Sequence, residues 1–196
     1  SNGGRLPAEA MKANAVNVWG TTGLLKILPV GTATGTPNIV LGNNGNMQSI
    51  LGDVEITPVS TVGPGSADNH NDTVHRDVHI SHVSNVLTVT GMAPGAIKYF
   101  SQFAPTLTGG SGGTTFYLDN LPTYGSFFNV NGGSSANDVL VAPANTGTTF
   151  SIWGNDYGNI NSVVIFNSME SLRGGGGNDT FRFISGFNSS GNLSGN

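Results

Sequence analysis

Two glycine-rich turns, 65 residues apart, sit in the same apolar frame. The segment Leu107–Leu118 reads LTGGSGGTTFYL, and the segment Leu172–Phe183 reads LRGGGGNDTFRF. The first leucine, a glycine pair, a third glycine, a threonine followed by an aromatic residue, and a last apolar residue fall at identical offsets. A recurring strand–turn–strand unit is typical of repeat architectures, in which each unit buries its apolar side chains only by stacking on its neighbours.

Most of the chain favours short β-strands over helices. Gly accounts for 30 of 196 residues, and Gly, Asn, Thr and Val all disfavour helix interiors. Short runs of β-branched and aromatic residues alternate with Gly, Asn, Asp and Pro, which is the pattern of strands joined by turns. We therefore predict an all-β domain over residues 15–196. Residues 1–14 are predicted to form an arm or a short helical cap, because Leu6–Ala13 contains an early proline and good helix formers.

Apolar residues recur at a spacing that suits stacked coils. Successive separations are 20, 23, 22 and 20 residues along the series Leu87, Leu107, Val130, Ile152 and Leu172. One turn of a parallel β-solenoid (a β-helix) has about this length. An antiparallel β-sandwich or jelly roll also contains many short strands, and it remains the alternative fold.

Composition excludes several functional classes. Charged residues make up 9% of the chain, its net charge is −4, and its 7 Lys and Arg residues are scattered, so we expect no nucleic-acid partner. No run of 18 apolar residues occurs, so we expect no membrane insertion. Cysteine is absent, which excludes disulfides, thiolate metal sites and a cysteine nucleophile. The chain starts at Ser1 without a visible signal peptide, and we expect a processed chain or a piece of a larger one.

Several segments resemble a known family. The run Ser168–Phe181 (SMESLRGGGGNDTF) resembles the "I-E-x-L-x-G-G-x-G-N-D-T-F" repeats of large bacterial surface proteins of the filamentous-haemagglutinin-like and RTX-adhesin-like kind. Met92–Tyr99 followed by Leu107–Phe116 resembles the same unit, and Val40–Val54 resembles another recurring segment. The resemblance covers residues 38–196. It implies an exported β-solenoid on the bacterial cell surface or in the extracellular matrix, with neighbouring repeats, other copies or surface glycans as partners and with no catalytic residues.

A calcium site is one interpretation of the second glycine-rich turn. Gly174–Arg182 matches the β-roll nonapeptide G-G-x-G-x-D-x-U-x, whose oxygen ligands suit Ca²⁺. The candidate ligands are Asp179, Asn178 and Gly177. The adjoining segments do not repeat the pattern. In the first glycine-rich segment, Thr114 occupies the position equivalent to Asp179, so that copy lacks the carboxylate. A tight turn held by Asp179 is therefore the alternative interpretation.

All four histidines lie close together in the sequence, between His70 and His82. On a strand, His75 and His79 would share one face with Asp77, and imidazoles bind Zn, Cu or Ni. A polar outer strand face without metal is the alternative interpretation.

Four aspartates recur at separations of 19, 18 and 23 residues: Asp119, Asp138, Asp156 and Asp179. A ladder of carboxylates would suit a polysaccharide-degrading β-helix enzyme, with Asp138 and Asp156 as the candidate pair. Exposed aromatics such as Trp153 and Tyr157 would suit a carbohydrate-binding adhesin. Because each aspartate adjoins Asn or Gly, as turns favour, we predict a non-enzymatic extracellular structural or adhesive module that associates end to end.

Overall fold

The computed structural model describes residues 4–5, 15–28, 38–57, 65–100, 105–122, 127–184 and 191–195. These residues form strands and turns and contain no helix, which confirms the all-β prediction. In this part of the chain no helix is long and apolar enough to cross a membrane. The predicted helical cap at Leu6–Ala13 lies outside the described residues.

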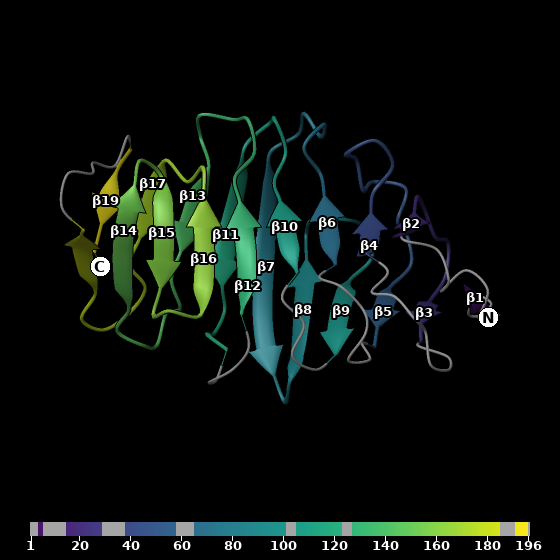
Figure 1. Cartoon of the computed structure of the whole chain (residues 1–196), viewed down its shortest axis with the longest axis horizontal. Helices are drawn as coiled ribbons and strands as arrows, with labels where there is room; N and C mark the ends of the chain where they lie inside the picture. The colour runs from purple at the N-terminus through teal and green to yellow at the C-terminus, as the bar shows by residue number, and fades with distance from the viewer. Residues whose placement is uncertain are drawn as a thin grey trace.

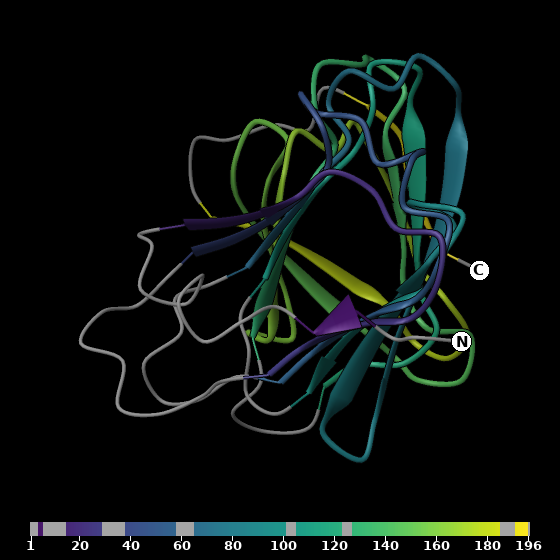
Figure 2. The same ribbon diagram turned by 90° about the vertical axis from the view of Figure 1, so that its right-hand side faces the viewer.

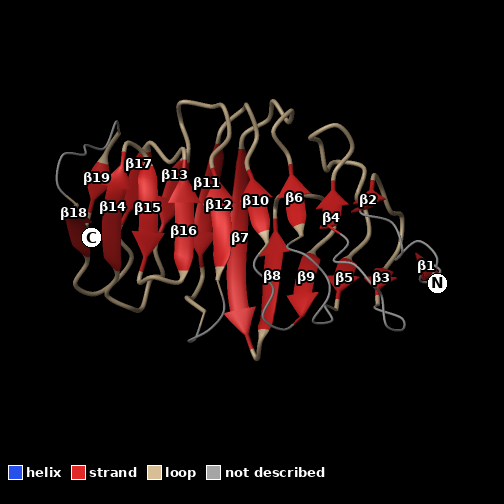
Figure 3. Cartoon of the chain, viewed as in Figure 1, coloured by secondary structure: helices blue, strands red, loops and turns tan. Residues whose placement is uncertain are grey.

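The strands form two open sheets (Figures 1 and 3). The ten-stranded sheet contains, in spatial order, β1 (Gly4–Arg5), β3 (Leu25–Ile27), β5 (Val54–Ile56), β9 (Ile97–Phe100), β8 (Val86–Thr90), β7 (Arg76–Val83), β11 (Thr114–Leu118), β13 (Val139–Val141), β17 (Ser171–Arg173) and β19 (Leu193–Ser194). The nine-stranded sheet contains β18 (Thr180–Phe183), β14 (Thr149–Gly154), β15 (Tyr157–Ile160), β16 (Val164–Asn167), β12 (Phe128–Asn131), β10 (Thr106–Thr108), β6 (Ser66–Asp68), β4 (Asn38–Leu41) and β2 (Ala15–Val18).

Most neighbouring strands are parallel, and the chain passes from one sheet to the other after almost every strand. For example, β10 in the nine-stranded sheet pairs in parallel with β6 and β12, while the next strand, β11, pairs in parallel with β7 and β13 in the opposite sheet. The two ends of the chain therefore lie at opposite ends of the long axis (Figure 1).

Two antiparallel meanders interrupt this alternation, one in each sheet. In the ten-stranded sheet the chain passes through β7, β8 and β9 as three adjacent antiparallel strands, and β9 lies beside β5. The chain then crosses to β10 in the other sheet. Strands β14, β15 and β16 do the same in the nine-stranded sheet. At the tip of the first hairpin Ser84 and Asn85 have φ values of 50° and 62°, which two-residue turns of type I′ require.

A unit of seven strands is repeated, and its second copy has the sheets exchanged. Strands β4 to β12 correspond in order to β11 to β19. Each pairing within the first set (β4–β6, β5–β9, β6–β10, β7–β8, β8–β9, β7–β11 and β10–β12) has its counterpart in the second. Leu107 in β10 thus corresponds to Leu172 in β17, as the shared glycine frame predicts. From the start of one unit to the start of the next there are seven connections between strands. Two of them lie within the meander and stay in one sheet, so the chain changes sheets an odd number of times and the next unit begins in the opposite sheet.

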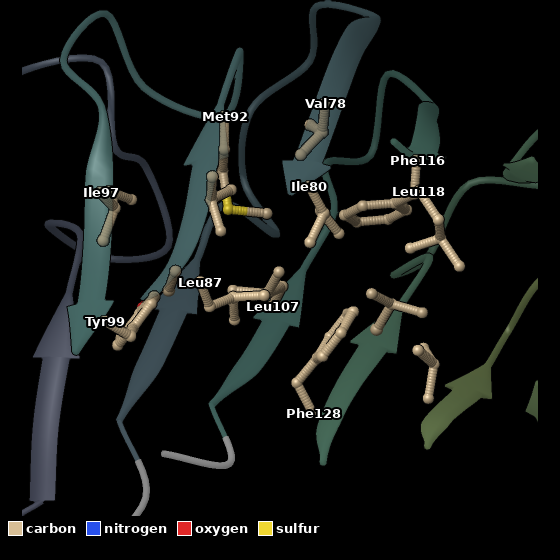
Figure 4. Packing of buried hydrophobic residues seen from close by; sticks show 14 of the residues in the cluster. Val78, Ile80, Leu87, Met92, Ile97, Tyr99, Leu107, Phe116, Leu118 and Phe128 are labelled. Carbon is tan, nitrogen blue, oxygen red and sulfur yellow. The ribbon is translucent and has the colours of Figure 1, made fainter. Parts of the chain in front are cut away.

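The core is a continuous apolar layer between the two sheets. Side chains alternate along each strand, so that Ile97 and Tyr99 of β9, or Phe128 and Val130 of β12, point inward and are buried. Figure 4 shows side chains from both sheets meeting in this layer. Viewed along the long axis, the two sheets face each other (Figure 2). The buried apolar side chains of both sheets form one cluster. Burying each large apolar side chain contributes about 1.5–3 kcal/mol.

The predicted coil spacing is wrong in part. Leu107 and Val130 are register partners on adjacent strands, but Leu87 and Leu172 lie in the other sheet and Ile152 lies beyond a meander. A regular period cannot continue through a segment that folds back on itself. Phe100 also lies only half-buried on the outer face, because Ile97 and Tyr99 take the inward positions of β9.

Candidate functional site

Three turns share one arrangement, in which a glycine packs directly against a polar side chain of the same turn. Gly132 covers Asp138, Gly174 covers Asp179, and Gly109 covers Thr114. A Cβ atom added at Gly132 would lie 2.6 Å from Asp138 Cβ, closer than carbon atoms can approach without strain. Gly109 and Gly174, which belong to the repeated frame, approach Thr114 and Asp179 as closely, so glycine is required at all three positions, and the polar side chains that these glycines cover point into the molecule.

Asp138 links the first residues of three neighbouring strands. Its Oδ1 accepts a hydrogen bond from Thr114 N at 2.6 Å, its N–H donates to Glu170 Oε2 at 2.9 Å, and its carbonyl oxygen accepts from Ser171 N at 3.0 Å. The side chain is fully buried, and Oδ2 has no hydrogen-bond partner in the described residues. Burial raises the pKa of Asp138 to about 7, although the Thr114 N–H opposes the rise, and the Glu170 carboxylate adds to it.

Asp179 performs the same task at the second glycine-rich turn. Its Oδ1 accepts a hydrogen bond from Thr148 N at 2.9 Å, which ties this turn to the turn that precedes β14, the strand paired with β18. Its Oδ2 is buried beneath Gly174. Asn178 and Gly177 are exposed beside it, and Gly177 has a φ of 87°. The structure thus places the three candidate calcium ligands in one tight turn, with the carboxylate of Asp179 directed inward. Their binding of calcium stays a prediction.

A second polar cluster, which sequence reasoning missed, surrounds Asp72. Its carboxylate accepts hydrogen bonds from Arg76 Nε at 2.7 Å, Asn69 Nδ2 at 3.0 Å, Gln48 Nε2 at 3.1 Å and Val74 N at 3.1 Å. Burial raises the pKa of Asp72, but the hydrogen bonds, led by that from Arg76, outweigh burial and hold the pKa below its ordinary value. Four partners drawn from two turns and from the start of β7 cannot be inferred from spacing along the sequence.

Replacing Arg76 by alanine is expected to lower the free energy of unfolding by about 2 kcal/mol, since a buried carboxylate loses its cation. Urea unfolding at neutral pH measures the change. The matched control is Lys26→Ala, which removes the exposed Lys26–Glu55 pair and should cost about 0.5 kcal/mol or less. Equal losses in the two variants would contradict a special role for the Asp72 cluster.

His75 and His79 lie on the outer face of the ten-stranded sheet, as predicted, but each has its own partner. His79 Nδ1 lies 2.9 Å from Asp119 Oδ1, and its ring stacks on Tyr117 with centroids 4.7 Å apart. His75 Nε2 lies 3.3 Å from Thr115 Oγ1. Among the described residues no group of three or more His, Asp or Glu side chains is placed to hold a metal ion. The histidine metal site stays a prediction.

The four recurring aspartates do not form one ladder. Asp138 and Asp156 follow strands of the nine-stranded sheet, whereas Asp119 and Asp179 follow strands of the ten-stranded sheet. Asp138 is buried and hydrogen-bonded to the backbone, so its carboxylate cannot reach a polysaccharide without rearrangement. In this arrangement Asp138 connects neighbouring strands of the ten-stranded sheet.

The two ends of the nine-stranded sheet carry exposed apolar side chains. At one end Phe183 is 45% exposed and Ile184 is 37% exposed, and at the other end Trp19 is 64% exposed. Trp19 borders a hollow of about 650 Å³ that is lined by Asn17, Val18, Trp19, Gly20, Thr21, Thr22, Gly23, Leu24, Leu25 and Ser49.

Comparison with known proteins adds no relative. No family model, no curated protein and no solved structure matches this chain. The resemblance to bacterial surface repeats therefore stays a prediction, and the function is argued from the geometry alone.

Proposed function

We propose that this chain is a β-solenoid segment that serves as a non-enzymatic structural or adhesive module of a bacterial surface or matrix protein. The observation that carries the proposal is the seven-strand unit, whose strand pairings recur in full with the sheets exchanged. A unit that repeats its pairings along one axis builds length, and length is the property that a surface or matrix element requires.

The buried polar side chains support the same role. Asp138 and Asp179 each join the turn of one coil to a backbone N–H of the preceding coil, that of Thr114 or of Thr148. Burial shields these hydrogen bonds from competing water, and removing either side chain would leave a buried backbone N–H without its acceptor. The acidic residues thus stabilise the stack of coils, and the proposal assigns them no part in chemistry on a substrate.

The stacking is expected to be visible by cysteine cross-linking, since the chain has no native cysteine. Thr106 and Asn129 are register partners on the parallel strands β10 and β12. Substituting both by cysteine should allow an intramolecular disulfide under mild oxidation, because Cα atoms on paired strands lie within disulfide range. The control pairs Thr106→Cys with Asn17→Cys on β2, three places away in the sheet. Disulfide formation only in the control pair would contradict the solenoid.

The same protein should be tested for activity and for binding. We expect a panel of polysaccharides to release no reducing ends above background. Release that disappears in Asp156→Asn would overturn the non-enzymatic proposal.

A second candidate, contact with surface glycans, is favoured by the edge-to-face pair of Trp153 and Tyr157 on the β14–β15 hairpin, whose ring centroids lie 5.5 Å apart. Glycan binding that is lost in Trp153→Ala would support that candidate.

A further inference from the structure

Equivalent positions in the two copies of the repeat differ sharply in exposure. Phe116 and Leu118 of β11 are 0% and 2% exposed. Their counterparts in β18 are Phe181, which is only partly buried against the core, and Phe183, which is 45% exposed. The difference comes from a missing neighbour. Strand β13 lies beside β11 and places Leu140 opposite Phe116, whereas β18 pairs only with β14 among the described strands.

The first copy of the repeat therefore indicates what β18 can accept. The neighbour should be a parallel strand with a branched aliphatic residue opposite Phe181. Such an edge combines unpaired backbone groups with exposed apolar side chains, which is the usual basis of strand addition. The hydrogen bonding between β18 and β14 also continues one residue past the end of β18, because Ile184 N donates to Ile152 O at 2.9 Å.

Strand β2, at the opposite end of the same sheet, meets these requirements. It pairs only with β4 among the described strands, and its inward residues are Val16 and Val18. The exposed Trp19 follows it directly. Strands β2, β4, β6, β10, β12 and β16 are parallel to one another. The chain direction reverses from β16 to β15 and again from β15 to β14, and β18 is parallel to β14. Strands β2 and β18 therefore run in the same direction. A second copy in the same orientation would therefore continue the sheet.

We infer that β18 of one copy binds β2 of a second copy as the next parallel strand, so that copies stack head to tail. In the register that continues both strands, Phe181 faces Val16, Phe183 faces Val18 and Ile184 faces Trp19. Strands β19 and β1 are the corresponding ends of the other sheet. Because the two surfaces differ, the contact is heterologous and leaves a free end on every copy. The inference rests on the proposed function and names the partner as this chain itself.

A charge exchange between Ile184 and Trp19 tests this register. The variants are Ile184→Lys, Trp19→Glu and the chain carrying both substitutions. Val83→Glu is the control, because Val83 is 62% exposed at the tip of the β7–β8 hairpin, away from both ends. Sedimentation velocity over a range of concentrations measures association, and circular dichroism confirms that each variant is folded.

We expect the unmodified chain to form linear oligomers that lengthen by roughly 45 Å per copy, from the spacing of about 4.8 Å between strands. Each single substitution should weaken association by roughly tenfold or more, corresponding to about 1.4 kcal/mol. The double variant should recover much of the loss, because its ammonium group faces a carboxylate of the next copy. The control should associate like the unmodified chain.

Three outcomes would overturn the inference. The unmodified chain could remain monomeric at all concentrations, or Trp19→Glu could have no effect while Ile184→Lys dissociates the oligomers, which would indicate contact between two β18 strands. The double variant could also fail to recover. If the Thr106–Asn129 disulfide still forms, only the docking is wrong and the solenoid module stands. If that disulfide also fails to form, the proposed function is wrong as well.

Discussion

Replacing Gly132 by alanine is expected to lower the free energy of unfolding by about 3 kcal/mol, at the upper end of what overpacking costs. The added methyl group would overlap the carbonyl oxygen of Ser168, which follows the neighbouring strand β16, and would press on Asp138 Cβ. Relief requires separating two backbone segments, since the obstructing atoms are not the end of a flexible side chain. Urea unfolding followed by circular dichroism measures the change.

The matched control is Gly23→Ala, because a methyl group at Gly23 would meet no atom within 4 Å. That substitution should leave stability within about 1 kcal/mol of the original chain, or raise it slightly by restricting the unfolded state. Similar stability for Gly132→Ala and Gly23→Ala would show that the turns after β12 and β16 do not approach each other as closely as the structure indicates.

Replacing Asp138 by asparagine is expected to remove a large dependence of stability on pH. The folded protein raises the pKa of Asp138 to about 7, from an ordinary value of 3.8. Between these values the folded state keeps the proton and the unfolded state releases it, so stability falls as the pH rises through this window. A difference of about three pKa units corresponds to a loss on the order of 4 kcal/mol. Asparagine has no proton to lose, and its Oδ1 can still accept from Thr114 N.

Unfolding midpoints at pH 4, 5, 6, 7 and 8 would test this expectation. The control is Asp77→Asn, which removes one negative charge from an exposed side chain on β7 and should retain the fall seen in the original chain. Because Asp72 contributes in the opposite direction, losing stability as the pH falls, only the slope above pH 5 is diagnostic. An unchanged slope in Asp138→Asn would contradict a buried protonated carboxyl group.

Most strands and much of the core follow from local sequence. Val86–Thr90, Ile97–Phe100 and Val139–Val141 are predicted with the bounds that the structure has, since alternating β-branched residues between turn residues give a strong local signal. Strand β6 is an exception, because its residues Ser66, Ala67 and Asp68 are neither β-branched nor aromatic and carry no local strand signal. It is held in the sheet by its parallel pairing with β4 on one side and β10 on the other.

The candidate site divides in the same way. The importance of Asp138 and Asp179 could be suspected from their regular spacing, but the spacing suggested a surface ladder, whereas both side chains are internal. The direction of each side chain depends on which backbone segment lies beside its turn, and that segment is distant in the sequence. The Asp72 cluster has no sequence signature, because its partners come from turns that are up to 24 residues away in the chain.

The sequence by itself determined the local conformation of this protein: extended segments with one apolar face, and glycine turns through which the backbone can bend and approach closely. Only the tertiary structure decided which sheet each strand joins, where the chain folds back in a meander, and which carboxylates are enclosed. The physical reason is that a period of two along a strand specifies which side chains point inward, while the partner across a parallel ladder is a distant segment that leaves no local trace.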